Sequence, residues 1–167
     1  YYHIHSKDRF LALQYLVDYY PDMYGIIFCR TRRETSEITI SLRRAGYHVD
    51  VLNGDLSQDQ RDRVMRQFRN RELQLLVATD IAARGLDVDD ISHIINYSLP
   101  DELELYVHRS GRTGRAGKKG LSMSLISSGE LRRVRPLEKM LCTSIQKRNV
   151  PTGEEIVQKQ ILYKLQK

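Results

Sequence analysis

The sequence predicts an α/β domain, in which helices cover both faces of a mostly parallel β-sheet. Short apolar runs alternate with segments whose apolar residues recur every three or four positions, which is the pattern of strands followed by amphipathic helices. The connections are short and no internal repeat or low-complexity linker interrupts them, as expected for successive βαβ units. A chain of 167 residues, 41% of them hydrophobic, is long enough to build one such core.

Each expected element has a local signal. The apolar runs predict strands over residues 24–29, 47–52, 73–78, 91–97 and 121–126. Thr31 with Glu34, and Ser57 with Gln60, are capping residues with partners three positions on, so each starts a helix, the first ending near Gly46. Further helices are expected over residues 7–20, 101–110 and 128–141, and Pro136 is expected to bend or break the last of these.

Composition changes near residue 143, where the chain becomes polar, and Pro151 and Gly153 then interrupt it. Residues 154–167 have the pattern of a helical tail. We therefore expect one domain over residues 1–142 and a polar tail or linker over residues 143–167.

Charge and cysteine content restrict the class of protein. The formal charge of +6 weakly indicates a polyanionic partner, although a basic domain without such a partner fits the charge equally well. Cys29 and Cys142 are too few for a disulfide framework and suit a reducing compartment, so we expect a cytoplasmic protein. No uncharged apolar run approaches the roughly 18–20 residues that span a bilayer, so no membrane partner is expected. The first residues lack both an initiator Met and a signal-peptide pattern, so a fragment of a longer protein is expected.

Polar residues follow three of the predicted strands, where ligands of open α/β sheets bind. Arg30 and Thr31 follow the first strand, residues 53–55 the second, and Thr79 and Asp80 the third. Taken one at a time, these residues are equally well explained as turn and cap residues.

The most informative segment is residues 106–120. Residues 108–119 contain five Lys or Arg and one His, with no acid and with glycines that let the backbone approach a ligand. On a helix, His108, Arg112 and Arg115 would share one face, and guanidinium groups suit phosphate oxygens. A localisation signal or a solvated loop would need neither the glycines nor the histidine.

The chain has no phosphate-cradling loop of its own. Gly117 and Lys118 are followed by Lys119 where a P-loop needs Ser or Thr, and Arg112 stands where its first Gly should be. Arginines that stabilise phosphoryl transfer can come from a separate domain. The segment therefore predicts one half of a two-part NTPase.

Residues 108–115 are similar to the last motif of superfamily 2 helicases, in the form found in DEAD-box ATP-dependent RNA helicases. Residues 78–87 resemble the preceding motif, and residues 26–32 the motif that opens the second RecA-like domain. The resemblance implies the C-terminal RecA-like domain alone, a three-layer sandwich, most similar to bacterial cold-shock-type members. Asn53 and Ser98 depart from the His and Asp of many members, which we expect to tune contacts without abolishing activity.

The resemblance assigns roles by position. Arg112 and Arg115 are expected to be arginine fingers on the γ-phosphate, and His108 to couple to the DEAD carboxylates of the other domain. Gly85 and Asp87 are expected near the ribose and phosphates. Asp80 is expected to meet a hydroxyl or amide donor. The positions expected along the RNA path are Arg30, Gly54, Asp55, Gln58, Arg61, Thr79, Asp80 and Arg84.

The implied function is local unwinding of RNA duplexes coupled to ATP hydrolysis. ATP and Mg²⁺ are expected to be bound mainly by an N-terminal RecA-like domain, which is the expected partner together with RNA, and no metal ligand is assigned here. The isolated chain is expected to be inactive. Two alternatives are half of a superfamily 2 DNA helicase or translocase, and a non-enzymatic RNA-binding or protein-interaction module, against which the intact Arg112 and Arg115 argue.

Overall fold

The computed structural model describes residues 1–167. These residues form two compact units: residues 24–123 are one, and residues 1–23 with 124–167 are the other. The first unit contains every residue that the sequence singles out for function.

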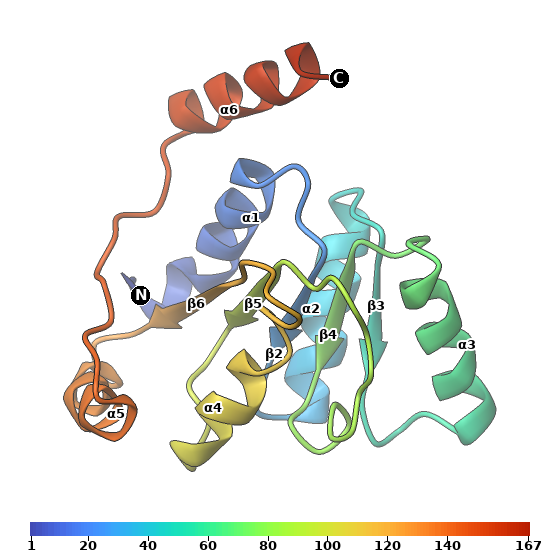
Figure 1. The fold of residues 1–167 in the computed structure, drawn as a ribbon, viewed down its shortest axis with the longest axis horizontal. Coiled ribbons are helices and arrows are strands. Elements are labelled where there is room, and N and C mark those ends of the chain that lie inside the picture. Colours follow the sequence, from blue (N-terminus) through green and yellow to red (C-terminus); the bar gives the residue numbers. More distant parts are fainter. The chain divides into compact units, whose positions relative to one another are not determined.

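The unit of residues 24–123 is built on a parallel sheet (Figure 1). Its strands are β2 (Gly25–Phe28), β3 (Val49–Leu52), β4 (Leu75–Ala78) and β5 (His93–Asn96), in the order β5-β2-β4-β3. All residues of β2, β4 and β5 are buried, because both faces of a parallel sheet are covered by its crossover helices. The predicted apolar runs are therefore confirmed as strands.

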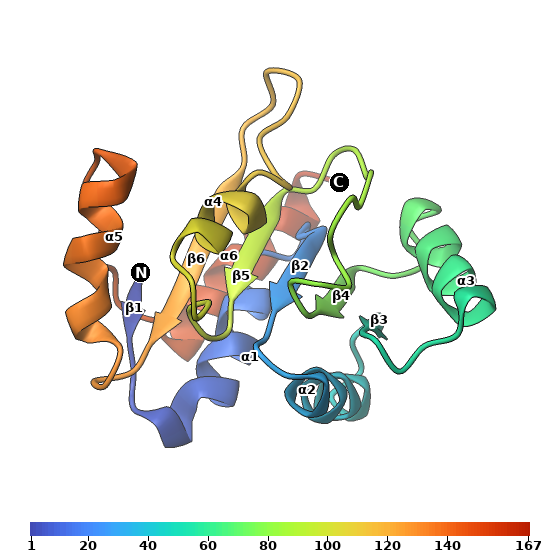
Figure 2. The same cartoon turned by 90° about the horizontal axis from the view of Figure 1, so that it is seen from below.

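Helices of this unit lie on both faces of the sheet. They are α2 (Arg32–Arg44), α3 (Gln58–Arg69) and α4 (Glu104–Ser110). The helices α2 and α3 lie on opposite faces because both connections are right-handed but run in opposite directions along the sheet. The connection from β2 through α2 leads to β3 at the edge, and the connection from β3 through α3 leads back to β4. Figure 2 shows α2 and α4 on opposite sides of the strands. On the α3 face, Phe68 packs among Ile26, Phe28, Leu76 and Ile94.

Both capping predictions are confirmed. The Thr31 side chain accepts a hydrogen bond from the Glu34 amide (3.1 Å). Ser57 and Gln60 form a reciprocal capping box, with distances of 3.2 and 2.9 Å between side-chain oxygens and backbone amides.

The second unit contains β1 (Tyr2–His3), which pairs in parallel with the end of β6 (Leu121–Ile126). Its helices are α1 (Arg9–Tyr19), α5 (Val134–Leu141) and α6 (Gly153–Leu165), with 3-10 turns over Ser6–Asp8 and Leu131–Arg133. Gln160 of α6 donates to the carbonyl of Asp18 (3.2 Å), and the Lys159 ammonium lies 5.4 Å from the Tyr19 ring centroid. The expected boundary after residue 142 stays a prediction, and α6 shares a compact unit with α1.

Two details differ from expectation. Strand β1 has two residues, too few to show the alternation that identifies a strand from sequence. The expected helix over 128–141 is wrong before residue 134, and Pro136 does not break it. Pro136 lies in the first turn of α5, where a backbone N–H has no intrahelical partner to lose. No helix combines the length and apolar composition needed to cross a bilayer.

Candidate nucleotide and RNA interface

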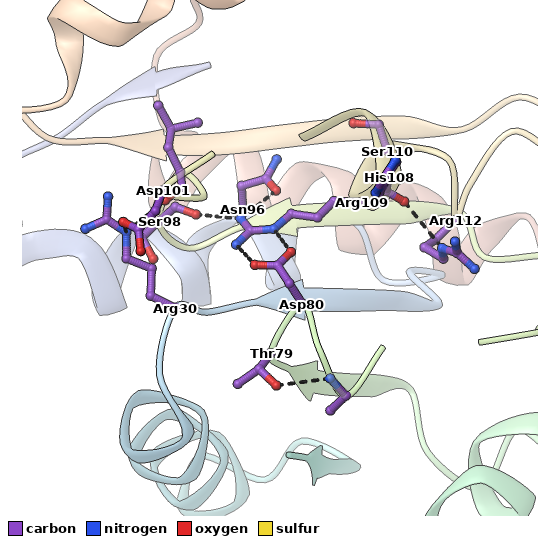
Figure 3. A network of polar contacts seen from close by, with 12 residues as sticks. Arg30, Thr79, Asp80, Asn96, Ser98, Asp101, His108, Arg109, Ser110 and Arg112 are labelled. Carbon is purple, nitrogen blue, oxygen red and sulfur yellow. Dashed lines mark hydrogen bonds and ion pairs between the residues drawn. The ribbon is translucent and has the colours of Figure 1, made fainter. Parts of the chain in front are cut away.

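The polar residues of the motifs converge beyond the carboxyl ends of β2, β4 and β5 (Figure 3). Arg30 follows β2, Thr79 and Asp80 follow β4, and Ser98 follows β5. The helix α4 contributes His108 and Arg109 to the same region. Parallel strands end at one edge of the sheet, so side chains from distant parts of the sequence meet there.

At the centre lies Arg109, whose side chain is 1% exposed. Its Nε and Nη2 donate to the two carboxylate oxygens of Asp80, at 2.6 and 2.7 Å. Its Nη1 donates to the Asn96 Oδ1 (3.2 Å) and to the Ser98 carbonyl (2.7 Å), and the guanidinium lies 5.1 Å from the centroid of the Phe28 ring. A buried charge with this many partners joins α4 to the ends of β4 and β5.

Sequence reasoning missed the role of Arg109. The available signal was helical spacing: Tyr106 and Arg109 are three residues apart and form the buried face of α4. The donor that meets Asp80 in this structure is therefore a guanidinium, not the hydroxyl or amide that we expected. The place of Asp80 on an RNA path stays a prediction.

Arg112 and Arg115 have a different environment. Arg112 donates from Nη1 to the Leu86 carbonyl (2.8 Å) and from Nε to the His108 carbonyl (3.3 Å). Arg115 donates from Nε to the Gly111 carbonyl (2.9 Å). Neither guanidinium forms an ion pair with an acid. Burial, and secondarily the charge of Arg115, lowers the pKa of Arg112 from its ordinary value, which indicates a position that an added anion would stabilise.

The expected common helical face of His108, Arg112 and Arg115 is wrong, because α4 ends at Ser110. The two arginines lie on the turns that follow, where Gly114 and Gly117 have φ of +70° and +75°. Figure 2 shows that this loop projects beyond α4. A left-handed backbone explains the glycines at these positions, since other residues adopt it at a cost.

Contacts with the connection between β4 and β5 hold the loop. The Thr113 hydroxyl donates to the Ile91 carbonyl, and Lys118 forms an ion pair with Asp90, which holds the pKa of that carboxyl below its usual range. A Cβ on Gly120 would lie 2.5 Å from the Gly114 amide nitrogen and would overlap the Thr113 side chain. Gly120 is therefore needed for the loop to close on itself.

Gly85 and Asp87 are the neighbours of Leu86, the residue whose carbonyl Arg112 contacts. Gly85 has φ of +72°, and the carbonyl between it and Asp87, that of Leu86, is the acceptor for Arg112. Asp87 has an exposed side chain, and its carbonyl accepts from Arg69 Nε (3.3 Å). A small cavity of about 50 Å³ is lined by Asp80, Arg84, His108, Arg109 and Arg112, together with Phe28, Ala83 and Leu105.

Five of the eight positions expected along the RNA path line one groove of about 820 Å³: Arg30, Gly54, Arg61, Thr79 and Asp80. The groove also contains residues that the sequence did not single out for this path, among them Arg32, Arg33, Asn53 and Ile81. The other three expected positions do not line it. Asp55 pairs with Arg32 (3.0 Å), Gln58 donates to Asp62 (2.8 Å), and Arg84 lines the small cavity.

Backbone carbonyls orient two of the groove arginines. Arg61 Nη1 donates to the Ala82 carbonyl (2.7 Å), and Arg30 Nε to the Leu99 carbonyl (2.9 Å), with Asp101 at 3.4 Å from the same nitrogen. A guanidinium has five N–H donors, so each keeps donors for a ligand. Ile81 is 81% exposed beside them, an apolar side chain in a groove of cations. No group of three or more His, Cys, Asp or Glu could hold a metal ion.

Comparison with known proteins agrees with this geometry. The model of the helicase conserved C-terminal domain matches residues 8–117. The chain belongs to this family. It is 38% identical to the ATP-dependent RNA helicase CshA of Limosilactobacillus reuteri over 162 residues, which are 96% of the chain and 33% of that protein. The chain thus spans about a third of the length of the curated relatives that it matches.

Solved structures of DEAD-box proteins are similar to this helicase domain. The E. coli DEAD-box protein SrmB, bound to regulator of ribonuclease activity A, is 31% identical with a TM-score of 0.83, covering 93% of this chain and 91% of that chain. S. cerevisiae Dbp5, bound to RNA and ADP BeF3, is 30% identical with a TM-score of 0.83, covering 99% of this chain and 44% of that chain. The expected resemblance to DEAD-box proteins and the expected RecA-like α/β fold are confirmed.

Proposed function

We propose that the chain is the C-terminal RecA-like half of an ATP-dependent RNA helicase, and that it supplies Arg112 and Arg115 to ATP. The observation that carries the proposal is the pairing of these guanidiniums with backbone carbonyls and with no carboxylate. Two neighbouring cations without an internal counter-ion suit an anionic ligand. The names of the curated relatives, which are ATP-dependent RNA helicases, support the same ligand.

ATP would supply the phosphoryl group, and an arginine finger provided by another domain is generally worth about 10³–10⁵ in rate. Arg112 and Arg115 stabilise the charge that develops on the γ-phosphate oxygens. Gly85 and Asp87 lie on the segment that Arg112 contacts, where Asp87 can accept a hydrogen bond from a ribose hydroxyl. ATP and Mg²⁺ are bound mainly by the N-terminal RecA-like domain, to whose carboxylates His108 couples.

RNA binds along the groove of Arg30, Arg61 and Thr79, with Gly54 allowing the backbone of the strand to approach closely. Cations and a hydroxyl read phosphates and 2′-hydroxyls, so binding is independent of base sequence. The roles of Asp55, Gln58 and Arg84 on the RNA path rest on the resemblance alone, since none of the three lines the groove.

Asp80 connects the two ligands in this proposal. It lines both the groove and the small cavity of Arg112, and it is held by Arg109 of α4. ATP and RNA each stabilise a closed arrangement of the two RecA-like domains, so that each increases the affinity for the other. Closure bends the bound strand and destabilises a short duplex locally. We place this activity in the cytoplasm. A DNA helicase half is not favoured, because the named relatives act on RNA.

Reconstitution tests the proposal. The chain alone is expected to hydrolyse no ATP, whereas the protein that joins it to its N-terminal RecA-like domain is expected to show ATPase activity stimulated by RNA and not by DNA. RNA-stimulated hydrolysis by the isolated chain, or a joined protein that RNA does not stimulate, would contradict it.

A further inference from the structure

Two segments of the chain carry many basic residues and few acids. Residues 108–120 contain five Lys or Arg and no acid, and the proposed function uses Arg109, Arg112 and Arg115 among them. Residues 131–148 contain six Lys or Arg and one acid, so their net charge is +5, whereas the whole chain has a formal charge of +6. Nothing in the proposed function uses this second segment.

Three of its cations share one face of a helical segment. Arg132 lies in the 3-10 turn before α5, and Arg135 and Lys139 lie on α5 itself, all three with exposed side chains. Their spacing of three and then four residues places them along one side. Val134 and Leu137 form the buried side of the same helix. We call Arg132, Arg135 and Lys139 the α5 basic face.

No acid neutralises this face. None of its three side chains forms an ion pair. The one carboxylate of the segment, Glu138, accepts a hydrogen bond from the Ile145 amide (2.9 Å) and so serves the turn after α5. Three like charges within eight residues, or about 10 Å of helix, repel one another until an anion binds.

We propose that the α5 basic face binds the phosphate backbone of RNA, as a second contact outside the groove; this rests on the proposed function. About 10 Å of helix corresponds to about three nucleotides of a strand, at roughly 3.4 Å each. The face has charges at its centre and no aromatic or apolar core of the kind that protein interfaces use. A membrane surface would require an exposed apolar side on α5, but Val134 and Leu137 are buried, and Met140 is a single exposed apolar side chain rather than an apolar side.

The test compares two variants of the chain that lose the same charge. R132Q/R135Q/K139Q removes the α5 basic face, and K159Q/K164Q/K167Q removes three exposed lysines of α6 in the same compact unit. Fluorescence anisotropy measures binding to long single-stranded oligouridine over a series of salt concentrations. The α5 variant is expected to reduce the slope of log K against log[salt] by about 2, at about 0.7 per phosphate contact, and to lower affinity at low salt by about tenfold or more. The α6 variant is expected to keep the wild-type slope.

Four outcomes overturn the inference. Equal losses in the two variants would show a general effect of net charge, and wild-type binding by the α5 variant would show no contact. A loss of binding to anionic vesicles without a loss of RNA binding would assign the face to membranes. R132K/R135K keeps the charges and is expected to bind RNA as the wild type does. A loss of RNA binding by this variant would indicate damage to the helix instead of lost charge, and would also count against the inference.

A groove variant separates this inference from the proposed function. R30Q/R61Q is expected to weaken RNA binding independently of the α5 variant. If the groove variant weakens binding and the α5 variant does not, the inference fails and the proposed function stands. If the wild-type chain binds no RNA, the inference fails, whereas the proposed function is tested separately by the RNA-stimulated ATPase activity of the joined protein.

Discussion

Arg109 and Arg112 are three residues apart in one motif, and their surroundings differ completely. Arg109 is buried and holds both oxygens of Asp80, the Asn96 side chain and the Ser98 carbonyl. Arg112 is partly exposed and, like Arg115, donates only to backbone carbonyls. A cation that has its carboxylate inside the chain serves the fold, whereas a cation oriented without one is prepared for an external anion.

The end of α4 produces this difference. Arg109 lies within the helix, on the face that it shares with Tyr106 toward the sheet. The helix ends at Ser110, and Arg112 and Arg115 lie on the turns that follow, where Gly114 has φ of +70°. One short sequence thus serves the core and the candidate site.

The largest expected effect is the loss of ATPase rate when Arg112 is replaced. In the full-length enzyme, Arg112→Ala is expected to lower kcat for ATP by about 10³-fold or more, because a finger contributes about 10³–10⁵ in rate. RNA affinity and the free energy of unfolding are expected to change little. Steady-state ATPase kinetics, RNA titration and urea unfolding measure the three quantities, and a kcat within tenfold of wild type would break the distinction between the two arginines.

A change at Arg109 is expected to lower the free energy of unfolding, which a change at Arg112 leaves nearly unchanged. Arg109→Met leaves the Asp80 carboxylate, with a side chain 20% exposed, without its guanidinium. Breaking a buried pair on one side costs about 3–5 kcal/mol of unfolding free energy, and we expect the lower part of that range here because Asp80 is partly exposed. Urea unfolding of the chain measures the loss. Arg112→Met is the matched control, and equal stability of the two variants would contradict the structural role of Arg109.

Gly120 tests whether the loop shape matters to the arginines. Gly120→Ala introduces a Cβ that overlaps Thr113, and relieving such overlap typically costs about 1–3 kcal/mol. We expect a modest loss in unfolding free energy and a clear loss of kcat in the full-length enzyme, with unchanged RNA affinity. Gly129→Ala is the control, because nothing lies within 4 Å of a Cβ there. If both variants kept wild-type kcat, the closed loop would not position the arginines.

The smallest effect is expected from a single groove cation. Arg61→Gln removes one phosphate contact, so the slope of log K against log[salt] should fall by about 0.7 for single-stranded RNA. ATPase activity at saturating RNA should stay near wild type. An unchanged slope in anisotropy titrations would remove Arg61 from the RNA path.

Local signals predicted much of the fold, because strands and caps depend on neighbouring residues. The apolar runs of β2 to β6 and the caps at Thr31 and Ser57 are examples. The network of Arg109 escaped prediction because Asp80 is 29 residues away in sequence and meets it only once the strand order is known. The predicted helical face shared by Arg112 and Arg115 is wrong for a local reason, since α4 ends at Ser110, earlier than the spacing of these residues suggested.

The most direct test is a structure of the full-length protein bound to RNA and to an ATP analogue with a γ-phosphate mimic. The guanidiniums of Arg112 and Arg115 are expected within hydrogen-bonding distance of that mimic, about 3 Å, while Arg109 keeps its contacts with Asp80. If Arg112 and Arg115 point into bulk solvent in that closed state, or if Arg109 leaves Asp80 to take their place, the account is contradicted.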